Sequence, residues 1–169
     1  GQSVIFDSST TVLEAARAFA ERGIPGTAVT NDLAIAGLLA PLRCVSVIVV
    51  GGTIRPHSGT LIGESAERLL DDLHVDLAVL GTHAVTGDML TETSPDVARV
   101  KRAMIKAARR TIVLADHTKF RVPAFATICR AKDVAALVTT RKTNAEALSL
   151  LHESGIEIHF ADGNAKYES

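Results

Sequence analysis

Short apolar runs alternate with longer helical patterns along almost all of this 169-residue chain, and this alternation limits the fold more than any other feature. The apolar runs have strand length, whereas the segments between them repeat apolar residues at helical spacing. Such alternation is typical of a mainly parallel sheet with helices on both faces and right-handed crossovers, so we predict an α/β fold of this kind. The predicted strands are residues 4–6, 27–30, 45–50, 77–80, 111–115, 135–139 and 156–160, and the predicted helices are residues 11–22, 32–39 (with Asn31 as N-cap), 64–73, 95–110 and 144–153.

Length and composition fit one globular domain, which we expect over residues 1–161, followed by a polar tail at residues 162–169. The longest apolar run, residues 45–50, is far shorter than the ~20 residues of a membrane span and predicts a strand buried on both faces. The chain lacks an initiator Met and begins almost inside a strand, so we expect it to be part of a longer polypeptide. No leader segment is recognisable, and we expect a cytoplasmic protein without a membrane partner.

Charge and cysteine content argue against several classes of protein. Lys and Arg total 18 against 19 for Asp and Glu, a formal net charge of -1, whereas a module that binds nucleic acid by itself carries a basic excess. The two cysteines lie outside any CxxC motif, and the six histidines include no i, i+4 pair. We therefore predict no disulfide framework, no metal site and no cofactor.

The residues that directly follow the predicted strands are polar and rich in hydroxyl groups and glycine. In parallel sheets a ligand binds beyond the carboxyl ends of the strands, near a reversal of strand order, so we place the candidate ligand site at this edge. Its residues are Asp7, Ser8, Ser9, Thr10 and Thr11 after the first strand, Thr30 and Asn31 after the second, Gly51, Gly52 and Arg55 after the third, Gly81 and His83 after the fourth, and Asp116 and Lys119 after the fifth.

Four consecutive hydroxyl residues, 8–11, lie between a predicted strand and a helix N-terminus. Free N–H groups and the positive end of the helix dipole favour an anion there. A single hydroxyl is typical of a helix cap, but four in succession favour phosphate binding. The motifs GxxxxGK[ST] and GxGxxG are absent, which argues against nucleotide hydrolysis and dinucleotide-dependent redox chemistry.

Glycine and basic residues add further candidates. Gly51 and Gly52 allow either the close approach of a ligand or a tight turn. Arg55 is either a phosphate contact or a solvated side chain. Lys101 shares an i, i+3, i+4, i+7 stripe with apolar residues, which predicts that it points inward and needs an anionic partner, either a bound phosphate or a carboxylate.

Acidic residues at the same edge are candidates for contacts with sugar hydroxyls. Asp7 directly follows the first predicted strand, and Asp116 forms an acid–base pair with Lys119 that is either functional or an exposed salt bridge. Glu92 lies in a polar loop that leads into a helix, so it is either a ligand contact or part of a helix cap.

Six stretches of the chain carry a resemblance to a known family. They are VIFDSSTT (4–11), VTND (29–32), VVGGTIRP (49–56), LIG (61–63), VKRAMI (100–105) and VLADHTKF (113–120). In this order and spacing the chain resembles the C-terminal effector-sensing domain of the DeoR family of bacterial transcriptional repressors. The resemblance implies a fold similar to ribose-5-phosphate isomerase and the CoA-transferases, and a phosphorylated sugar as ligand. It also implies an upstream winged helix-turn-helix that binds operator DNA, and a homodimer or homotetramer.

Two positions depart from the family pattern and bear on which sugar fits. Ser9 stands where the family usually has Gly, and Thr82-His83 stands where it often has a small residue and a carboxylate. We expect a non-catalytic sugar-phosphate sensor in which residues 8–11 hold the phosphate with the help of Lys101 or Lys119. Sugar hydroxyls would be contacted by Asp7, Asn31 and Asp116.

Two alternatives to a sensor stay open. One is an aldose–ketose isomerase that uses Asp116, Glu92 or Asp7 as the base and Lys101 as the electrophile. The other is an oligomerisation domain with a vestigial pocket.

Overall fold

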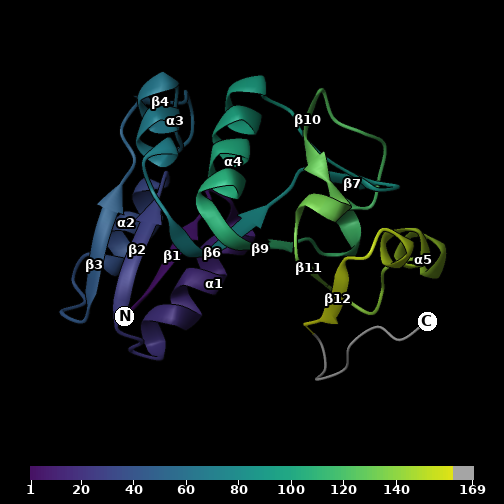
Figure 1. Ribbon diagram of the computed structural model, residues 1–169, viewed down its shortest axis with the longest axis horizontal. Helices are drawn as coiled ribbons and strands as arrows, with labels where there is room; N and C mark the ends of the chain where they lie inside the picture. Colours follow the sequence, from purple (N-terminus) through teal and green to yellow (C-terminus); the bar gives the residue numbers. More distant parts are fainter. Residues whose placement is uncertain (162–169) are drawn as a thin grey trace.

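The computed structural model describes residues 1–161, and seven parallel strands form its central sheet (Figure 1). The strands are β1 (Gln2–Phe6), β2 (Gly26–Thr30), β3 (Val45–Val49), β6 (Val75–Gly81), β9 (Ala108–Leu114), β11 (Ala136–Thr139) and β12 (Glu157–Phe160). Their order across the sheet is β12-β11-β9-β6-β1-β2-β3, and every neighbouring pair is parallel. The predicted α/β class with a mainly parallel sheet is confirmed.

The order of the strands reverses once, between β1 and β6. From β1 the chain adds β2 and β3 on one side, then returns across the sheet to add β6, β9, β11 and β12 on the other. The turns after β1 and β6 leave the sheet in opposite directions, and this topological switch point is the place where α/β sheets bind ligands. The strand order therefore locates the candidate site between residues that follow Phe6 and residues that follow Leu80.

Helices cover both faces of the sheet, as predicted. α1 (Thr10–Glu21) and α2 (Leu33–Leu39) lie on one face, and α3 (Glu64–Asp71), α4 (Pro95–Ala107) and α5 (Ala145–Glu153) lie on the other. Successive side chains of a strand point to opposite faces, and β1 shows this directly. Val4 and Phe6 join a core cluster with Val12 of α1, whereas Ile5 joins the cluster that contains Met104 of α4.

A second, antiparallel sheet was not predicted. Its strands, in the order β10-β8-β7, are β7 (Ala84–Thr86), β8 (Met89–Glu92) and β10 (Ala126–Arg130). A two-stranded hairpin, β4 (Thr53–Ile54) and β5 (Leu61–Ile62), and two 3-10 turns, η1 (His117–Lys119) and η2 (Ala131–Asp133), complete the described elements. The predicted strict alternation of strand and helix is thus wrong between β3 and α3, between β6 and α4 and between β9 and β11, where short strands are inserted.

Three predicted details need correction. β3 is an edge strand rather than one buried on both faces, and its Val49 is 40% exposed. The helix predicted to reach residue 110 ends at Ala107, because Ala108 and Arg110 pair with β6 instead. The cap of α2 is Asp32, which accepts hydrogen bonds from the first turn of the helix, and not Asn31.

Two sequence expectations concern other parts of the chain. The polar tail predicted at residues 162–169 lies outside the described residues. Every helix within residues 1–161 is too short or too polar to cross a lipid bilayer.

Two glycines test how far backbone conformation contributes to this fold. A Cβ added at Gly37, inside α2, or at Gly63, which caps α3 with φ 106°, meets no atom within 4 Å. We expect Gly37→Ala to raise the free energy of unfolding by about 0.5–1 kcal/mol, because glycine in a helix is less favourable than alanine by that amount. We expect Gly63→Ala to lower it, because alanine is strained at positive φ. Urea denaturation measures both, and a shift of both variants in the same direction would contradict this explanation.

Candidate functional site

The turns that follow β1 and β6 are in close contact at the switch point. The Gly81 N–H donates to Asp7 Oδ2 over 3.0 Å. A Cβ at Gly81 would lie 2.4 Å from Ser9 Oγ and 2.8 Å from Ser9 Cβ, so the two turns approach this closely only because residue 81 is glycine. The resemblance noted above places glycine at the position of Ser9. In this chain the Ser9 side chain fills the space beside Gly81.

A buried lysine joins these turns to the second sheet. Lys101 Nζ, from α4, lies 3.0 Å from Asp7 Oδ2 and 3.0 Å from Glu92 Oε2, and it donates to the Gly81 carbonyl over 2.7 Å. The side chains of Lys101 and Asp7 are 2% and 0% exposed, and that of Glu92 is 12% exposed. The inward direction predicted for Lys101 is confirmed. The anions beside it are the protein's own carboxylates, and Glu92 lies on β8 rather than in a helix cap, which Ser94 provides.

Burial and charge act in opposite directions on these three groups. Burial raises the pKa of Asp7, and the nearby Lys101 ammonium only partly offsets this. Burial alone would lower the pKa of Lys101, but the Asp7 and Glu92 carboxylates outweigh it and hold that pKa above its ordinary value. Burial alone would raise the pKa of Glu92, but the Lys101 charge and the hydrogen bonds from Thr93 and Lys101 together outweigh it and lower that pKa. With all three ionised the cluster carries one net negative charge.

One oxygen of this cluster has no partner. Asp7 Oδ1 is buried and makes no hydrogen bond within the described part of the chain. An unsatisfied buried carboxylate oxygen is costly. Asp7 is therefore the buried residue of the site whose hydrogen-bonding capacity is least used.

Two of the four hydroxyl groups at residues 8–11 are used within the protein. Ser8 Oγ donates to Asp32 Oδ2 over 2.7 Å and lies 2.6 Å from Thr60 Oγ1. Ser9 Oγ caps α1 by accepting from the Val12 N–H over 3.1 Å. The hydroxyls of Thr10 and Thr11 make no hydrogen bond within residues 1–161 and remain available to a ligand.

Thr30 and Asn31, at the end of β2, form hydrogen bonds to the turn that follows β1. Both are fully buried. Thr30 Oγ1 donates to the Phe6 carbonyl over 2.7 Å, and Asn31 Oδ1 accepts from the Ser8 N–H over 3.0 Å. Asp7, Thr30 and Asn31 are thus closed to solvent in this state, and their predicted contacts with a ligand stay a prediction.

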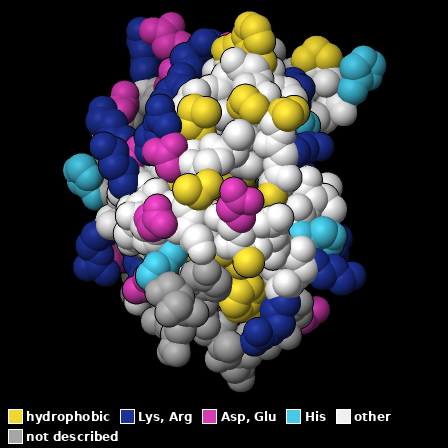
Figure 2. Space-filling model, turned by 90° about the vertical axis from the view of Figure 1, so that its right-hand side faces the viewer, with side chains coloured by type: hydrophobic (Ala, Val, Ile, Leu, Met, Phe, Trp, Pro, Cys, Tyr) yellow, Lys and Arg dark blue, Asp and Glu magenta, His cyan; other side chains and the backbone are white. Residues whose placement is uncertain are grey.

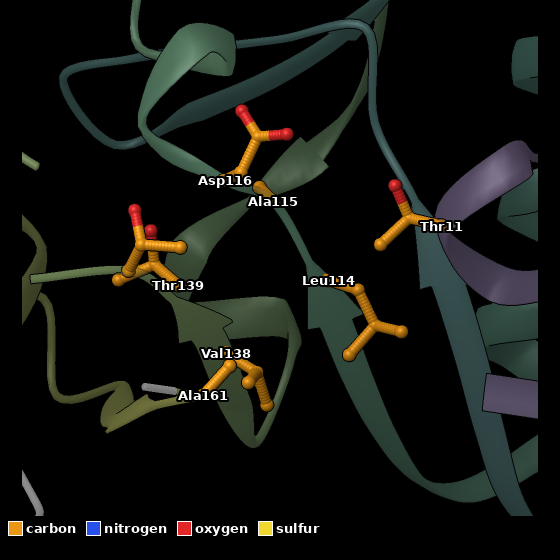
Figure 3. Close-up of a pocket in the computed structure, with 8 residues that line it drawn as sticks. Thr11, Leu114, Ala115, Asp116, Val138, Thr139 and Ala161 are labelled. Atoms are coloured by element: carbon orange, nitrogen blue, oxygen red, sulfur yellow. The ribbon is translucent and has the colours of Figure 1, made fainter. Parts of the chain in front are cut away.

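A hollow opens beside the N-terminus of α1, at the carboxyl ends of β9 and β11 (Figure 3). It contains about 440 Å³ of empty space, part of it open to solvent. Figure 3 shows the Thr11 and Asp116 oxygens on two sides of it, with Thr139 nearby. Asp116 accepts hydrogen bonds from the Thr118 hydroxyl (2.5 Å) and N–H (2.7 Å), and chiefly the hydroxyl bond lowers the pKa of Asp116. The remaining lining residues are Leu114, Ala115, Val138, Thr140 and Ala161.

His83 and Arg121 form a second polar group near Glu92. Arg121 Nη2 donates to the His83 carbonyl over 2.8 Å and lies 2.9 Å from His83 Nε2. Burial and then the Arg121 charge lower the pKa of His83, so its imidazole is neutral at pH 7 and accepts at Nε2. Arg121 begins a loop that exposes Val122 and Phe125 by 80% and 85%. Figure 2 shows the right-hand side of the molecule in Figure 1, where hydrophobic side chains lie at the surface.

The remaining predicted residues lie in the β4–β5 hairpin and in η1. Gly52 has φ 125°, and a Cβ there would lie 2.3 Å from the Ile62 carbonyl, so its close approach is to strand β5. The Arg55 N–H donates to the Thr60 carbonyl within the same hairpin. The ligand roles of Gly51, Gly52, Arg55 and Lys119 stay predictions.

Sequence reasoning missed some residues of this edge. Thr139 ends the strand β11 and Thr140 follows it, so the rule used for the other strands would have found them. Arg121 follows a 3-10 turn and has no comparable sequence signal. Within residues 1–161, no group of three or more His, Cys, Asp or Glu side chains is arranged to hold a metal ion, and both cysteines are free.

Comparisons with known proteins agree with one family. The family model described as the DeoR C terminal sensor domain matches residues 1–141. The HTH-type transcriptional repressor GlcR of Bacillus subtilis is 30% identical over 158 residues, which cover 94% of this chain and 60% of that protein. The transcriptional repressor AccR of Agrobacterium fabrum is 33% identical over 145 residues, covering 85% and 56%. The chain thus spans about 60% of the length of such relatives.

Solved structures are similar in fold. The eIF2B delta subunit of Chaetomium thermophilum gives a TM-score of 0.57 at 16% identity, over 81% of this chain and 48% of that one. Translation initiation factor eIF-2B of Pyrococcus horikoshii gives 0.54 at 18% identity, over 81% and 56%. Ribose 5 phosphate isomerase A of Neisseria gonorrhoeae, a fold named by the sequence resemblance, gives 0.49 at 15% identity, over 72% and 46%.

The buried cluster makes a strong prediction for Lys101. We expect Lys101→Met to lower the free energy of unfolding by about 3–5 kcal/mol, because it leaves two carboxylates without their buried cation. Asp7→Asn in the same chain should restore part of the loss, since it removes one of those charges. Lys106→Met, at an exposed lysine paired with Asp71, is the matched control and should leave the urea midpoint nearly unchanged. If Lys101→Met and Lys106→Met lowered the free energy of unfolding equally, Lys101 would not be needed to balance the two buried carboxylates.

The environment of His83 predicts how stability depends on pH. The unfolded chain has an ordinary histidine pKa of 6.5, whereas folding lowers it, so stability present above pH 6.5 is lost as the pH falls. The carboxyl groups with lowered pKa titrate below this range. Between pH 7.5 and pH 5.5, we expect a smaller loss of unfolding free energy in His83→Gln than in the wild type. Arg121→Gln should also reduce the loss, and equal pH profiles in all three proteins would show that His83 does not cause it.

Proposed function

Because the chain belongs to the DeoR C terminal sensor domain family, we propose that it binds a phosphorylated sugar and so controls operator DNA binding by a helix-turn-helix elsewhere in the same protein. The named relatives are transcriptional repressors, and the family is regulatory rather than enzymatic. Because a bacterial repressor acts on chromosomal DNA, we also propose a cytoplasmic location. The family resemblance further supports a homodimer or homotetramer.

The observation that carries the proposal is the open N-terminus of α1. Ser9 satisfies the Val12 N–H, but the N–H groups of Thr10 and Thr11 have no acceptor within the helix. They add to the free Thr10 and Thr11 hydroxyls and to the positive end of the helix dipole, a combination that suits a phosphate dianion. The adjoining hollow has room for the rest of a sugar phosphate.

The contacts of the sugar follow from which polar groups remain open. Asp116 lies across the hollow from Thr11 and suits a sugar hydroxyl, whereas the Thr139 hydroxyl is buried and paired with that of Thr143 (Figure 3). Lys101 already has three acceptors, so Lys119, two residues from the start of η1, is the better candidate for a phosphate contact. Asp7 and Asn31 shape the turn that holds the phosphate rather than contact the sugar directly.

Control of DNA binding requires that the ligand distinguish two arrangements of the repressor. A ligand shifts such an equilibrium only by the difference between its affinities for the two arrangements. The switch point suits this task, since its turns come from both halves of the sheet. A ligand that contacts both halves of the sheet has an affinity that depends on how the two halves are placed relative to each other.

The Thr10 and Thr11 hydroxyls provide the direct test. We expect glucose 6-phosphate, fructose 6-phosphate, ribose 5-phosphate or glycerol 3-phosphate to raise the melting temperature of the chain, while the free sugars do not. The double variant Thr10→Val, Thr11→Val should weaken the best of these ligands by at least about 100-fold, because it removes two hydrogen bonds to a charged group that contribute about 1.5–3 kcal/mol each, although the N–H groups remain. Thr27→Val, in the middle of β2, is the matched control. Equal affinity in the double variant and the control would exclude this phosphate site.

A further inference from the structure

The hydrogen-bonding capacity of Lys101 is already full. A lysine ammonium has three N–H donors. Three acceptors surround Lys101 Nζ, namely Asp7 Oδ2 and Glu92 Oε2 at 3.0 Å and the Gly81 carbonyl at 2.7 Å. A ligand oxygen can therefore bind Lys101 only by replacing one of them.

Glu92 is the partner that can be replaced. The Gly81 carbonyl belongs to the end of the central strand β6. The Asp7 side chain is 0% exposed, and its Oδ2 also accepts from the Gly81 N–H. The Glu92 side chain is 12% exposed, it ends the short strand β8, and its other oxygen is bonded to the adjacent residue Thr93.

The charges around Glu92 favour an exchange with a neutral oxygen. With Glu92 in place the buried cluster carries one excess negative charge, whereas Lys101 and Asp7 alone are balanced. Glu92, Arg121 and Lys119 all lie close enough to His83 to affect its pKa, so two cations lie around the same imidazole as Glu92. A Glu92 carboxylate that leaves Lys101 is therefore released toward positive charge.

We propose that Glu92 is an internal competitor of the effector: it occupies Lys101 in the free protein, and a neutral carbonyl or hydroxyl oxygen of the bound sugar replaces it. This inference rests on the proposed function, since it assigns Lys101 to the sugar end of a phosphorylated ligand. Glu92 thereby sets the affinity for the effector without being a contact that the effector needs. Its carboxylate moves toward His83 and Arg121 when the site fills.

Two substitutions of Glu92 separate competition from simple charge. Glu92→Gln removes the charge that holds the side chain on Lys101. Glu92→Asp keeps the charge but is shorter by one methylene group and no longer spans the 3.0 Å contact. Calorimetric titration uses the member of the sugar-phosphate panel above that raises the wild-type melting temperature most. We expect both variants to lower its Kd, by about tenfold for Gln, which corresponds to one charge-assisted hydrogen bond.

Glu67→Gln is the matched control, since Glu67 pairs with Arg99 on the surface of α3. Its Kd should equal that of the wild type. An unchanged or higher Kd in Glu92→Gln would overturn the inference while leaving the proposed function intact. So would a lower Kd in Glu92→Gln combined with a wild-type Kd in Glu92→Asp, because charge alone would then explain the effect. If no member of the panel binds any of these proteins, the proposed function fails and this inference fails with it.

Should Glu92→Gln fail to fold, as circular dichroism would reveal, the Asp variant carries the test alone. In that case a lower Kd than that of the wild type supports displacement, and an equal or higher Kd overturns it.

Discussion

The ammonium group of Lys101 is the interaction on which the arrangement of this edge depends. It connects α4 to the end of β1 through Asp7, to the end of β6 through the Gly81 carbonyl, and to the second sheet through Glu92. A buried cation without such partners would be strongly unfavourable, so these elements are held in one relative placement. Any ligand that binds at the switch point therefore meets a lysine whose charge is already paired with the Asp7 and Glu92 carboxylates.

The polar groups of this edge divide into a closed half and an open half. Around β2 and the β4–β5 hairpin, Ser8, Asn31 and Thr60 bond one another or the adjacent backbone and leave little for a ligand. Around β9 and β11, Thr11 and Asp116 face a hollow instead. Hydrogen bonds within the protein thus build a rigid turn on one side, whereas on the other side the Thr11 hydroxyl is left for a ligand beside the hollow.

The sequence predicts the parallel sheet and the edge that carries the site, because apolar periodicity and strand order follow simple rules. It also predicts the inward direction of Lys101 from its helical stripe. It does not predict that Glu92 is a partner, since β8 has only four residues and pairs both with the short strand β7 and with β10, more than thirty residues later. Nor does it distinguish Ser8 from Thr11: the hydroxyl chemistry is the same, and only tertiary contacts such as the one with Thr60 decide which is free.

The second sheet gives the site a short route to the molecular surface. Glu92 ends β8, which pairs with β10, and the loop before β10 is tied back by the Ala124 N–H to Thr91 Oγ1 and by Arg121 to His83. That loop exposes Val122 and Phe125, although its backbone is held at both ends. A Glu92 carboxylate that leaves Lys101, as proposed above, alters the charge beside His83, to which Arg121 is bonded. Two arrangements of one carboxylate would then couple an interior site to the exposed residues of this loop.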